Sequence, residues 1–360
     1  MHCGSEILIG DRLVSAQSPT YFIADIAANH DGDLGRAKDL IWLAKEAGAE
    51  AAKFQHFLAG DIVSDHGFKT MGGQQSHQST WEKSVFEVYE QYHCPRDWTE
   101  ELRKTCADAS IHFMTTPYDA EAVDMFANIV PAFKIGSGDI TWLEFIEKIA
   151  SKDIPVFLAC GASDMAEVED AVATILACNP KLVLMQCNTN YTGDIENFKY
   201  INLRVLRAFA EKWPDLILGL SDHSFGHASV LGAVTMGARV VEKHFTDDNS
   251  RTGPDHHFAM NPKTWREMID RTRELEATFG DGIKRVEGNE TDTLVIQRRA
   301  IRLKEDLPAG TVLDRDHLEI LRPCPSDAIS PRQLSDVLGK PLRCAKNAHE
   351  HLTWPDINSV

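Results

Sequence analysis

Eight short apolar runs recur before residue 250, and stretches with helical periodicity separate most of them. Val, Ile, Leu and Phe dominate these runs, as in parallel strands that are buried on both faces. Eight strand-then-helix units predict a closed (β/α)₈ TIM barrel. An open doubly wound sheet is the alternative, but no Gly-x-Gly-x-x-Gly turn follows the first run. The predicted strands cover residues 21–27, 49–55, 111–115, 132–136, 155–159, 181–187, 216–221 and 238–244.

The predicted helices between these runs are amphipathic. They cover residues 34–47, 119–128, 141–151, 164–177 and 226–236. The interval 56–110 is longer than the others, and a stretch rich in Gly, Gln, Ser and His (67–80) precedes two further helix candidates there.

The pattern changes after residue 281. A charged connector comes first, and short strand candidates with Gly and Pro turns follow it. Such a pattern is typical of a small β-rich domain. We therefore expect a barrel domain over residues 1–281, a linker over 282–297 and a β-rich domain over 298–360.

Charge and cysteine usage exclude several classes of protein. The formal net charge is −17, which disfavours a broad surface for nucleic acid or anionic membrane. No run reaches the roughly 18 apolar residues of a membrane span, and the first residues lack the pattern of a signal peptide. The eight cysteines form no Cys-x-x-Cys pair, which is typical of reduced thiols. We expect a soluble cytoplasmic protein.

Polar residues gather at the carboxyl ends of the predicted strands, whereas the first halves of the strands are almost wholly apolar. In a TIM barrel, the carboxyl ends build the active site. The polar residues at these ends are Asp25, Asn29, His30, Lys53, Gln55, His56, Thr115, Thr116, Lys134, Ser137, Asp139, Gln186, Asn188, Ser221, Asp222, His223, Glu242 and His244.

Two histidines suggest a metal site. His223 and His244 end the last two strands, which are neighbours in a closed barrel. A lone histidine is more often structural, but two imidazoles beside Asp222 and Glu242 favour a divalent metal with open positions for water and substrate. His256 and His257 lie in a loop beyond the last strand, where we expect an exposed or supporting role.

Two lysines at the same mouth have two interpretations. Lys53 and Lys134 each follow a buried run, which argues against solvated surface lysines. Each can hold a phosphate or act as a Schiff-base amine. With the hydroxyls of Thr116, Ser137 and Ser221, they can form a phosphate site. Asp25 and Asp139 are candidate acid–base groups, with structural hydrogen bonding as the alternative.

Several segments together resemble one known family. They are Ile-Ala-Asp-Ile-Ala-Ala-Asn-His-Asp-Gly (23–32), Gly-Ala-Glu-Ala-Ala-Lys-Phe-Gln (48–55), Thr-Thr-Pro-Tyr (115–118), Lys-Ile-Gly-Ser-Gly-Asp (134–139), Asn-Tyr (190–191), Gly-Leu-Ser-Asp-His-Ser (219–224), Glu-Lys-His-Phe-Thr (242–246) and Arg-Thr-Gly-Pro-Asp-His (251–256). The chain resembles the sialic acid synthases, which include N-acetylneuraminate, legionaminic and pseudaminic acid synthases. Its carboxyl-terminal part, with Leu-Arg-Pro at 321–323, resembles the antifreeze-like, or SAF, domain of that family.

The resemblance implies condensation of phosphoenolpyruvate with an N-acylated amino-sugar aldehyde, with release of phosphate. It implies that His223 and His244 bind Mn²⁺, or Mg²⁺ or Co²⁺ in its place. The residues implied for phosphoenolpyruvate are Lys53, Thr116, Lys134, Ser137 and Ser221, and those implied for the sugar are Gln55, Tyr191 and Asp255. It also implies a domain-swapped homodimer in which Arg322 of the partner subunit contacts the sugar.

The chain departs from the family pattern at four places. Asp25 and Asp139 stand where the family commonly has Glu, and Ala159 stands where it has a phosphate-contacting Ser. The segment 72–81 differs from that of N-acetylmannosamine enzymes. N-acetylmannosamine and a 2,4-diacetamido-6-deoxy hexose therefore both remain candidates for the sugar.

Two further functions are alternatives to this synthase. One is a Schiff-base pyruvate lyase that uses Lys134 or Lys53, and the other is a non-catalytic sugar-binding protein.

Overall fold

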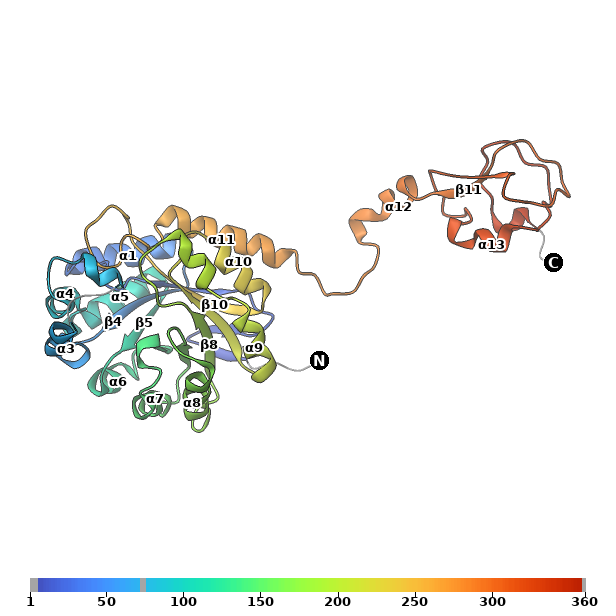
Figure 1. Cartoon of the computed structure of the whole chain (residues 1–360). Coiled ribbons are helices and arrows are strands. Elements are labelled where there is room, and N and C mark those ends of the chain that lie inside the picture. Colours follow the sequence, from blue (N-terminus) through green and yellow to red (C-terminus); the bar gives the residue numbers. More distant parts are fainter. Residues whose placement is uncertain (1–5, 72–75, 358–360) are drawn as a thin grey trace. The chain divides into compact units, whose positions relative to one another are not determined.

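The computed structural model describes residues 6–71 and 76–357. The chain forms two compact units, one that ends at Phe279 and one that begins at Gly280. Figure 1 shows a ring of helices around the strands of the first unit. Each unit has an apolar core of its own.

The first unit contains a closed parallel barrel of eight strands in the order β10-β3-β4-β5-β6-β7-β8-β9. The predicted TIM barrel is therefore confirmed, and each strand overlaps its predicted range. The strands are β3 (Tyr21–Asp25), β4 (Ala51–His56), β5 (His112–Pro117), β6 (Phe133–Ile135), β7 (Val156–Ala159), β8 (Leu182–Cys187), β9 (Ile217–Asp222) and β10 (Ala238–His244).

Helices cover the outside of the barrel (Figure 1). In α1 (Leu34–Glu46), Asp33 caps the first turn, and Ala37, Leu40, Ile41 and Ala44 form a buried stripe at helical spacing. The other helices that follow barrel strands are α6 (Ala120–Phe126), α7 (Leu143–Ala150), α8 (Met165–Leu176), α9 (Val205–Lys212), α10 (Ala228–Thr235) and α11 (Pro262–Ala277).

An antiparallel hairpin precedes the barrel. It consists of β1 (Ile7–Ile9) and β2 (Arg12–Val14). Ile7, Ile9 and Val14 join the apolar cluster inside the barrel, so the hairpin covers the amino-terminal end of the strands. Strands of three residues are too short to produce a recognisable alternation of apolar and polar residues, so this hairpin was not predicted from the sequence.

The long interval after β4 forms an excursion of short helices. They are α2 (Ala59–Ile62), α3 (Asp65–Thr70), α4 (Val85–Tyr92) and α5 (Thr99–Ala109). The last two match the two helix candidates expected here. Part of the segment 72–81, at residues 72–75, lies outside the described residues.

The second unit is small and has few regular elements. Strands β11 (Ala300–Leu303) and β12 (Leu318–Leu321) pair antiparallel, and α13 covers Leu334–Val337. Helix α12 (Thr291–Gln297) occupies the second half of the predicted linker. The domain limits given from sequence otherwise stay predictions.

Two findings concern membrane spans and disulfide bonds. None of the helices within the described ranges is long and apolar enough to cross a bilayer. The seven cysteines of the described residues are all unpaired.

Close packing at Gly219 yields a stability prediction. A Cβ added there would lie 2.8 Å from the backbone oxygen of Val240 and 2.9 Å from Cγ of Met185. We expect Gly219→Ala to lower the free energy of unfolding by about 1–3 kcal/mol, because the barrel interior must shift to admit it. Urea denaturation should show the loss, with Gly60→Ala as the control because nothing lies within 4 Å of its added Cβ. Equal losses in both variants would contradict the packing argument.

Candidate functional site

A cavity of about 430 Å³ opens at the carboxyl ends of the barrel strands. A smaller, deeper chamber of about 40 Å³ adjoins it, and the two share Gln55, Tyr118, Gly136, Ser137, Tyr191 and His244 as walls. The remaining walls of the deep chamber are Asp25, Lys53, Thr116, Lys134, Ala159, Cys187, Ser221, His223 and Glu242. The two lysines and two histidines singled out from sequence therefore line one chamber.

Lys53 is held from both sides inside the deep chamber. Its Nζ lies 2.7 Å from Oδ2 of Asp25 and 3.1 Å from Oγ1 of Thr116. Oε1 of Glu242 lies 3.7 Å away. Burial lowers the pKa of Lys53, but Asp25 and Glu242 outweigh that cost and leave it above its usual value. The side chain is therefore an ammonium ion at neutral pH.

Lys134 is bound to Glu242, which the sequence analysis had placed only beside the histidines. Lys134 Nζ donates to Oε1 of Glu242 at 2.8 Å and to Oγ of Ser221 at 3.4 Å. The other carboxylate oxygen, Oε2, is buried without a hydrogen-bond partner among the described residues. Glu242 thus holds two ammonium groups and keeps one oxygen unpaired at the chamber.

His223 and His244 lie with their ring centres 5.4 Å apart. Nδ1 of His223 donates to the carbonyl of Asn188 at 2.8 Å, which leaves Nε2 with its lone pair. Burial and then His244 lower the pKa of His223 to about 3, so this imidazole is neutral. Nδ1 of His244 is buried without a hydrogen-bond partner in the described part of the chain.

The two candidate acid–base carboxyls have opposite environments. Burial raises the pKa of Asp25, but Lys53, His244 and Gln55 together bring it below the usual value. Burial alone raises the pKa of Asp139 to about 6. Asp25 is therefore a fixed anion, whereas Asp139 can exchange a proton near neutral pH.

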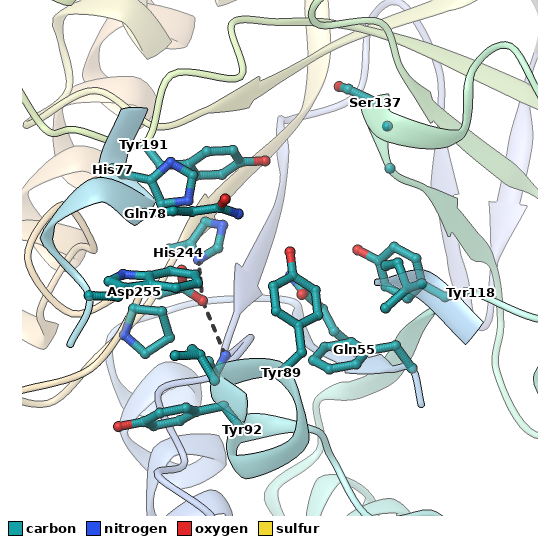
Figure 2. A pocket seen from close by; sticks show the side chains of 18 of the residues that line it. Gln55, His77, Gln78, Tyr89, Tyr92, Tyr118, Ser137, Tyr191, His244 and Asp255 are labelled. Carbon is teal, nitrogen blue, oxygen red and sulfur yellow. Dashed lines mark hydrogen bonds and ion pairs between the residues drawn. The ribbon is translucent and has the colours of Figure 1, made fainter. Parts of the chain in front are cut away.

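The wider cavity carries the residues expected at the sugar. Oδ2 of Asp255 accepts from the amide of Ala28 at 3.3 Å and lies 3.7 Å from Nδ1 of His244. Gln55 donates to Asp25 at 3.0 Å. In Figure 2, Tyr191 and His77 lie on one side of the cavity, and Gln55 and Tyr118 lie on the other.

Tyrosines that the sequence analysis did not assign also line this cavity. Tyr89 and Tyr92 come from α4, and Tyr118 follows β5. Burial raises the pKa of Tyr89 to about 12 and raises that of Tyr118 well above its usual value, so both phenols stay protonated. Two tyrosines three residues apart on one helix were the available signal, since such residues share a face.

Other polar strand ends face the helices rather than the cavity. His56 forms a hydrogen bond with Oγ1 of Thr115, and its ring lies tilted against that of Phe126, with the ring centres 4.3 Å apart. Asp222 bonds the buried ammonium of Lys243 at 2.5 Å, so it does not join the histidines. Side chains alternate along a strand, which turns every second residue outward.

Ser137 and Arg322 complete the predicted set. Oγ of Ser137 accepts from the amide of Gly161 at 2.9 Å beside the deep chamber. Arg322 is exposed on the second unit, so its role at the sugar stays a prediction.

The sequence matches the family model described as NeuB family over residues 40–284 and the SAF domain model over residues 298–358. The chain belongs to the NeuB family. Because NeuB proteins are sialic-acid-type synthases, the chain is a phosphoenolpyruvate-dependent synthase of that kind.

Relatives of several activities align over almost the whole chain. The N,N'-diacetyllegionaminic acid synthase of Legionella pneumophila is 32% identical over 94% of this chain and 95% of its own length. The human N-acetylneuraminate-9-phosphate synthase is 30% identical over 91% of this chain and 90% of its own. The crystal structure of the Bacillus subtilis spore coat protein SpsE matches with a TM-score of 0.65 and 28% identity, over 99% of this chain and 100% of that one. The sugar differs among such relatives, so membership of the NeuB family leaves it open.

Glu242 yields a prediction about stability and ligand. We expect Glu242→Gln to lower the free energy of unfolding by about 3 kcal/mol or more, because it leaves buried ammonium groups without their shared anion. Phosphoenolpyruvate should then raise the melting temperature of the variant more than that of the parent, since it restores negative charge. Differential scanning calorimetry with and without phosphoenolpyruvate measures both effects. Glu121→Gln is the control, because Glu121 is exposed in its ion pair with Arg96. A Glu242→Gln variant that melts like the parent would contradict this account.

Proposed function

We propose that this NeuB-family synthase condenses phosphoenolpyruvate with an unphosphorylated 2,4-diacetamido-6-deoxy hexose, to give a legionaminic-type acid. N-acetylmannosamine is the second candidate. The observation that carries the proposal is the lining of the wider cavity. Two relatives agree with it: the N,N'-diacetyllegionaminic acid synthase of Legionella pneumophila and that of Campylobacter jejuni, which is 31% identical to this chain.

The wider cavity suits an acylated, weakly polar sugar. Phe57, Ile62, Trp81 and Val88 supply apolar surface for methyl groups. The protonated phenols of the tyrosines and the amides of Gln55 and Gln78 supply hydrogen bonds. None of the described residues that line this cavity is a lysine or an arginine. A sugar phosphate held inside this cavity would find none of the lysine or arginine side chains that usually bind phosphate among these residues.

A panel of sugars tests the proposal. Purified protein is given phosphoenolpyruvate with the diacetamido-deoxy hexose, N-acetylmannosamine or N-acetylmannosamine 6-phosphate, and products are identified by mass spectrometry beside an assay for inorganic phosphate. We expect the highest kcat/KM for the first sugar and the lowest for the phosphorylated one. Preference for the phosphorylated sugar would sink the proposal.

In this proposal, phosphoenolpyruvate binds at the deep chamber through its phosphate and carboxylate. The ammonium groups of Lys53 and Lys134 hold its phosphate and carboxylate, and the hydroxyls of Thr116, Ser137 and Ser221 add hydrogen bonds. A Schiff base needs a neutral amine. The raised pKa of Lys53 and the bond from Lys134 to Glu242 oppose that state, which argues against the lyase alternative.

NeuB enzymes generally depend on a divalent metal, and His223 and His244 fit one. His223 is neutral with its Nε2 lone pair available, and the buried Nδ1 of His244 has no hydrogen-bond partner among the described residues. No group of three or more His, Cys, Asp and Glu side chains in the described ranges is arranged to hold a metal. The remaining ligands would therefore be water and substrate. When bound, the ion would polarise the aldehyde as a Lewis acid.

The side chains of the site then stabilise charge and transfer protons. The methylene carbon of phosphoenolpyruvate forms the new C–C bond with the aldehyde carbon, whose oxygen becomes an alkoxide. Water adds to the phosphate-bearing carbon and gives one proton to the alkoxide. The bond from that carbon to the bridging oxygen then breaks, the added hydroxyl becomes the ketone oxygen, and its proton leaves on the released phosphate. We assign to Asp139 the transfer of the water's proton to the alkoxide. Asp25 remains ionised and holds Lys53 in place.

The pKa of Asp139 gives a pH prediction. A carboxylate that accepts a proton is active when ionised, so kcat/KM should fall as the pH drops through about 6. Asp139→Asn should lower kcat by roughly 100-fold or more and should remove this limb of the profile. Steady-state rates from pH 5 to 8 measure both. If Asp139→Asn keeps the same fall in kcat/KM at acidic pH, a group other than Asp139 causes that fall.

Assembly and location belong to the same proposal. We infer a domain-swapped homodimer in which Arg322 of the partner subunit contacts the sugar's N-acyl group. We place the reaction in the cytoplasm, where phosphoenolpyruvate is made and where unpaired cysteines persist.

A further inference from the structure

A buried histidine joins the two loops that border the sugar side of the cavity. His256 lies in the loop after β10 and has no exposed surface. Its Nε2 lies 2.9 Å from Oδ1 of Asp31, in the loop after β3, and its Nδ1 lies 2.7 Å from Oγ1 of Thr246. A carboxylate only accepts, so Nε2–H is the donor to Asp31. Both ring nitrogens of His256 are therefore engaged.

Asp31 has two further partners, Arg251 from the loop of His256 and Arg36 from α1, whose Nε lies 3.2 Å from Oδ2 of Asp31. Nε and Nη2 of Arg251 lie 2.8 and 2.7 Å from its Oδ2. Asp31 itself has a positive φ of 54°, a conformation that needs support from its surroundings. A Cβ added to Gly253 would lie 2.6 Å from Cδ2 of His256 and 3.4 Å from Oδ1 of Asp31. The contact is thus close-packed as well as hydrogen-bonded.

The residue before His256 is Asp255, which faces the cavity. Its Oδ2 meets the amide of Ala28, in the same loop as Asp31, and lies 3.7 Å from His244 (Figure 2). A residue that is pinned at one side chain leaves its chain neighbour little freedom. The position of the Asp255 carboxylate therefore depends on the contact between Asp31 and His256.

We propose that Asp31 and His256 form a clamp that sets the Asp255 carboxylate for the amino sugar. Both are positioning residues, and their role at the sugar rests on the function proposed above. A displacement of about 1 Å in a positioning group can cost on the order of 100-fold in rate. Phosphoenolpyruvate in the deep chamber does not depend on this clamp, because none of its proposed ligands comes from either loop.

Two amide substitutions separate the clamp from simple filling of space. In His256→Gln the amide nitrogen can replace Nε2 and keep the bond to Asp31, whereas in His256→Asn it can replace only Nδ1 and keep the bond to Thr246. Glu101→Gln, at an exposed pair with Lys38, is the control. Each protein is assayed with phosphoenolpyruvate and whichever sugar of the panel the parent turns over best.

We expect His256→Asn to raise the KM for the sugar about 10-fold or more, with the KM for phosphoenolpyruvate changed less than twofold. His256→Gln should lie closer to the parent, and Glu101→Gln should match it. Equal KM values for the sugar in His256→Asn and the parent would overturn the clamp. So would a parallel rise in both KM values, which is the result of a general loss of structure.

Hydrogen–deuterium exchange gives a second test that needs no substrate. Amides in residues 246–258 should exchange faster in His256→Asn than in His256→Gln and the parent. Unchanged exchange in this loop would overturn the clamp even if the parent is active. If the parent fails to use any sugar of the panel, the proposed function fails, while faster exchange would still show that Asp31 and His256 hold the loop.

Discussion

The site depends on one set of buried charges at the carboxyl ends of the strands. Lys53 and Lys134 share the carboxylate of Glu242, and Asp25 binds Lys53 from the other side. Removing any member of a buried network leaves another charge unpaired, so the four side chains hold one another in a single arrangement. The barrel supplies the geometry, because its parallel strands all end at the same rim.

Much of the fold could be predicted from the sequence because the signal is long and repeated. Each buried strand is a nearly continuous apolar run, and each helix such as α1 has an apolar stripe. The hairpin β1–β2 could not be found in this way, since its strands have three residues each. The limits of short strands also differ from the prediction: the strand predicted over residues 132–136 is β6, which spans only Phe133–Ile135.

The candidate site was predictable as a set of strand ends but not in its internal pairing. No sequence signal shows that Glu242 points inward to the lysines while Asp222 points outward to Lys243, because both lie in the carboxyl-terminal halves of apolar strands. One residue of register decides between the two directions. The tyrosines of α4 were missed for another reason: they come from an excursion, and their approach to the cavity depends on tertiary packing.

The charge balance of the deep chamber connects these features to the chemistry. The two ammonium groups and the carboxylates of Asp25 and Glu242 cancel, and the neutral His223 adds nothing. Phosphoenolpyruvate, which we propose binds there, would bring roughly three negative charges, two on the phosphate and one on the carboxylate. In a protein of net charge −17, this excess needs a local cation. A divalent ion at His223 and His244 would supply most of the missing positive charge. It would therefore stabilise bound phosphoenolpyruvate electrostatically, in addition to its effect on the aldehyde.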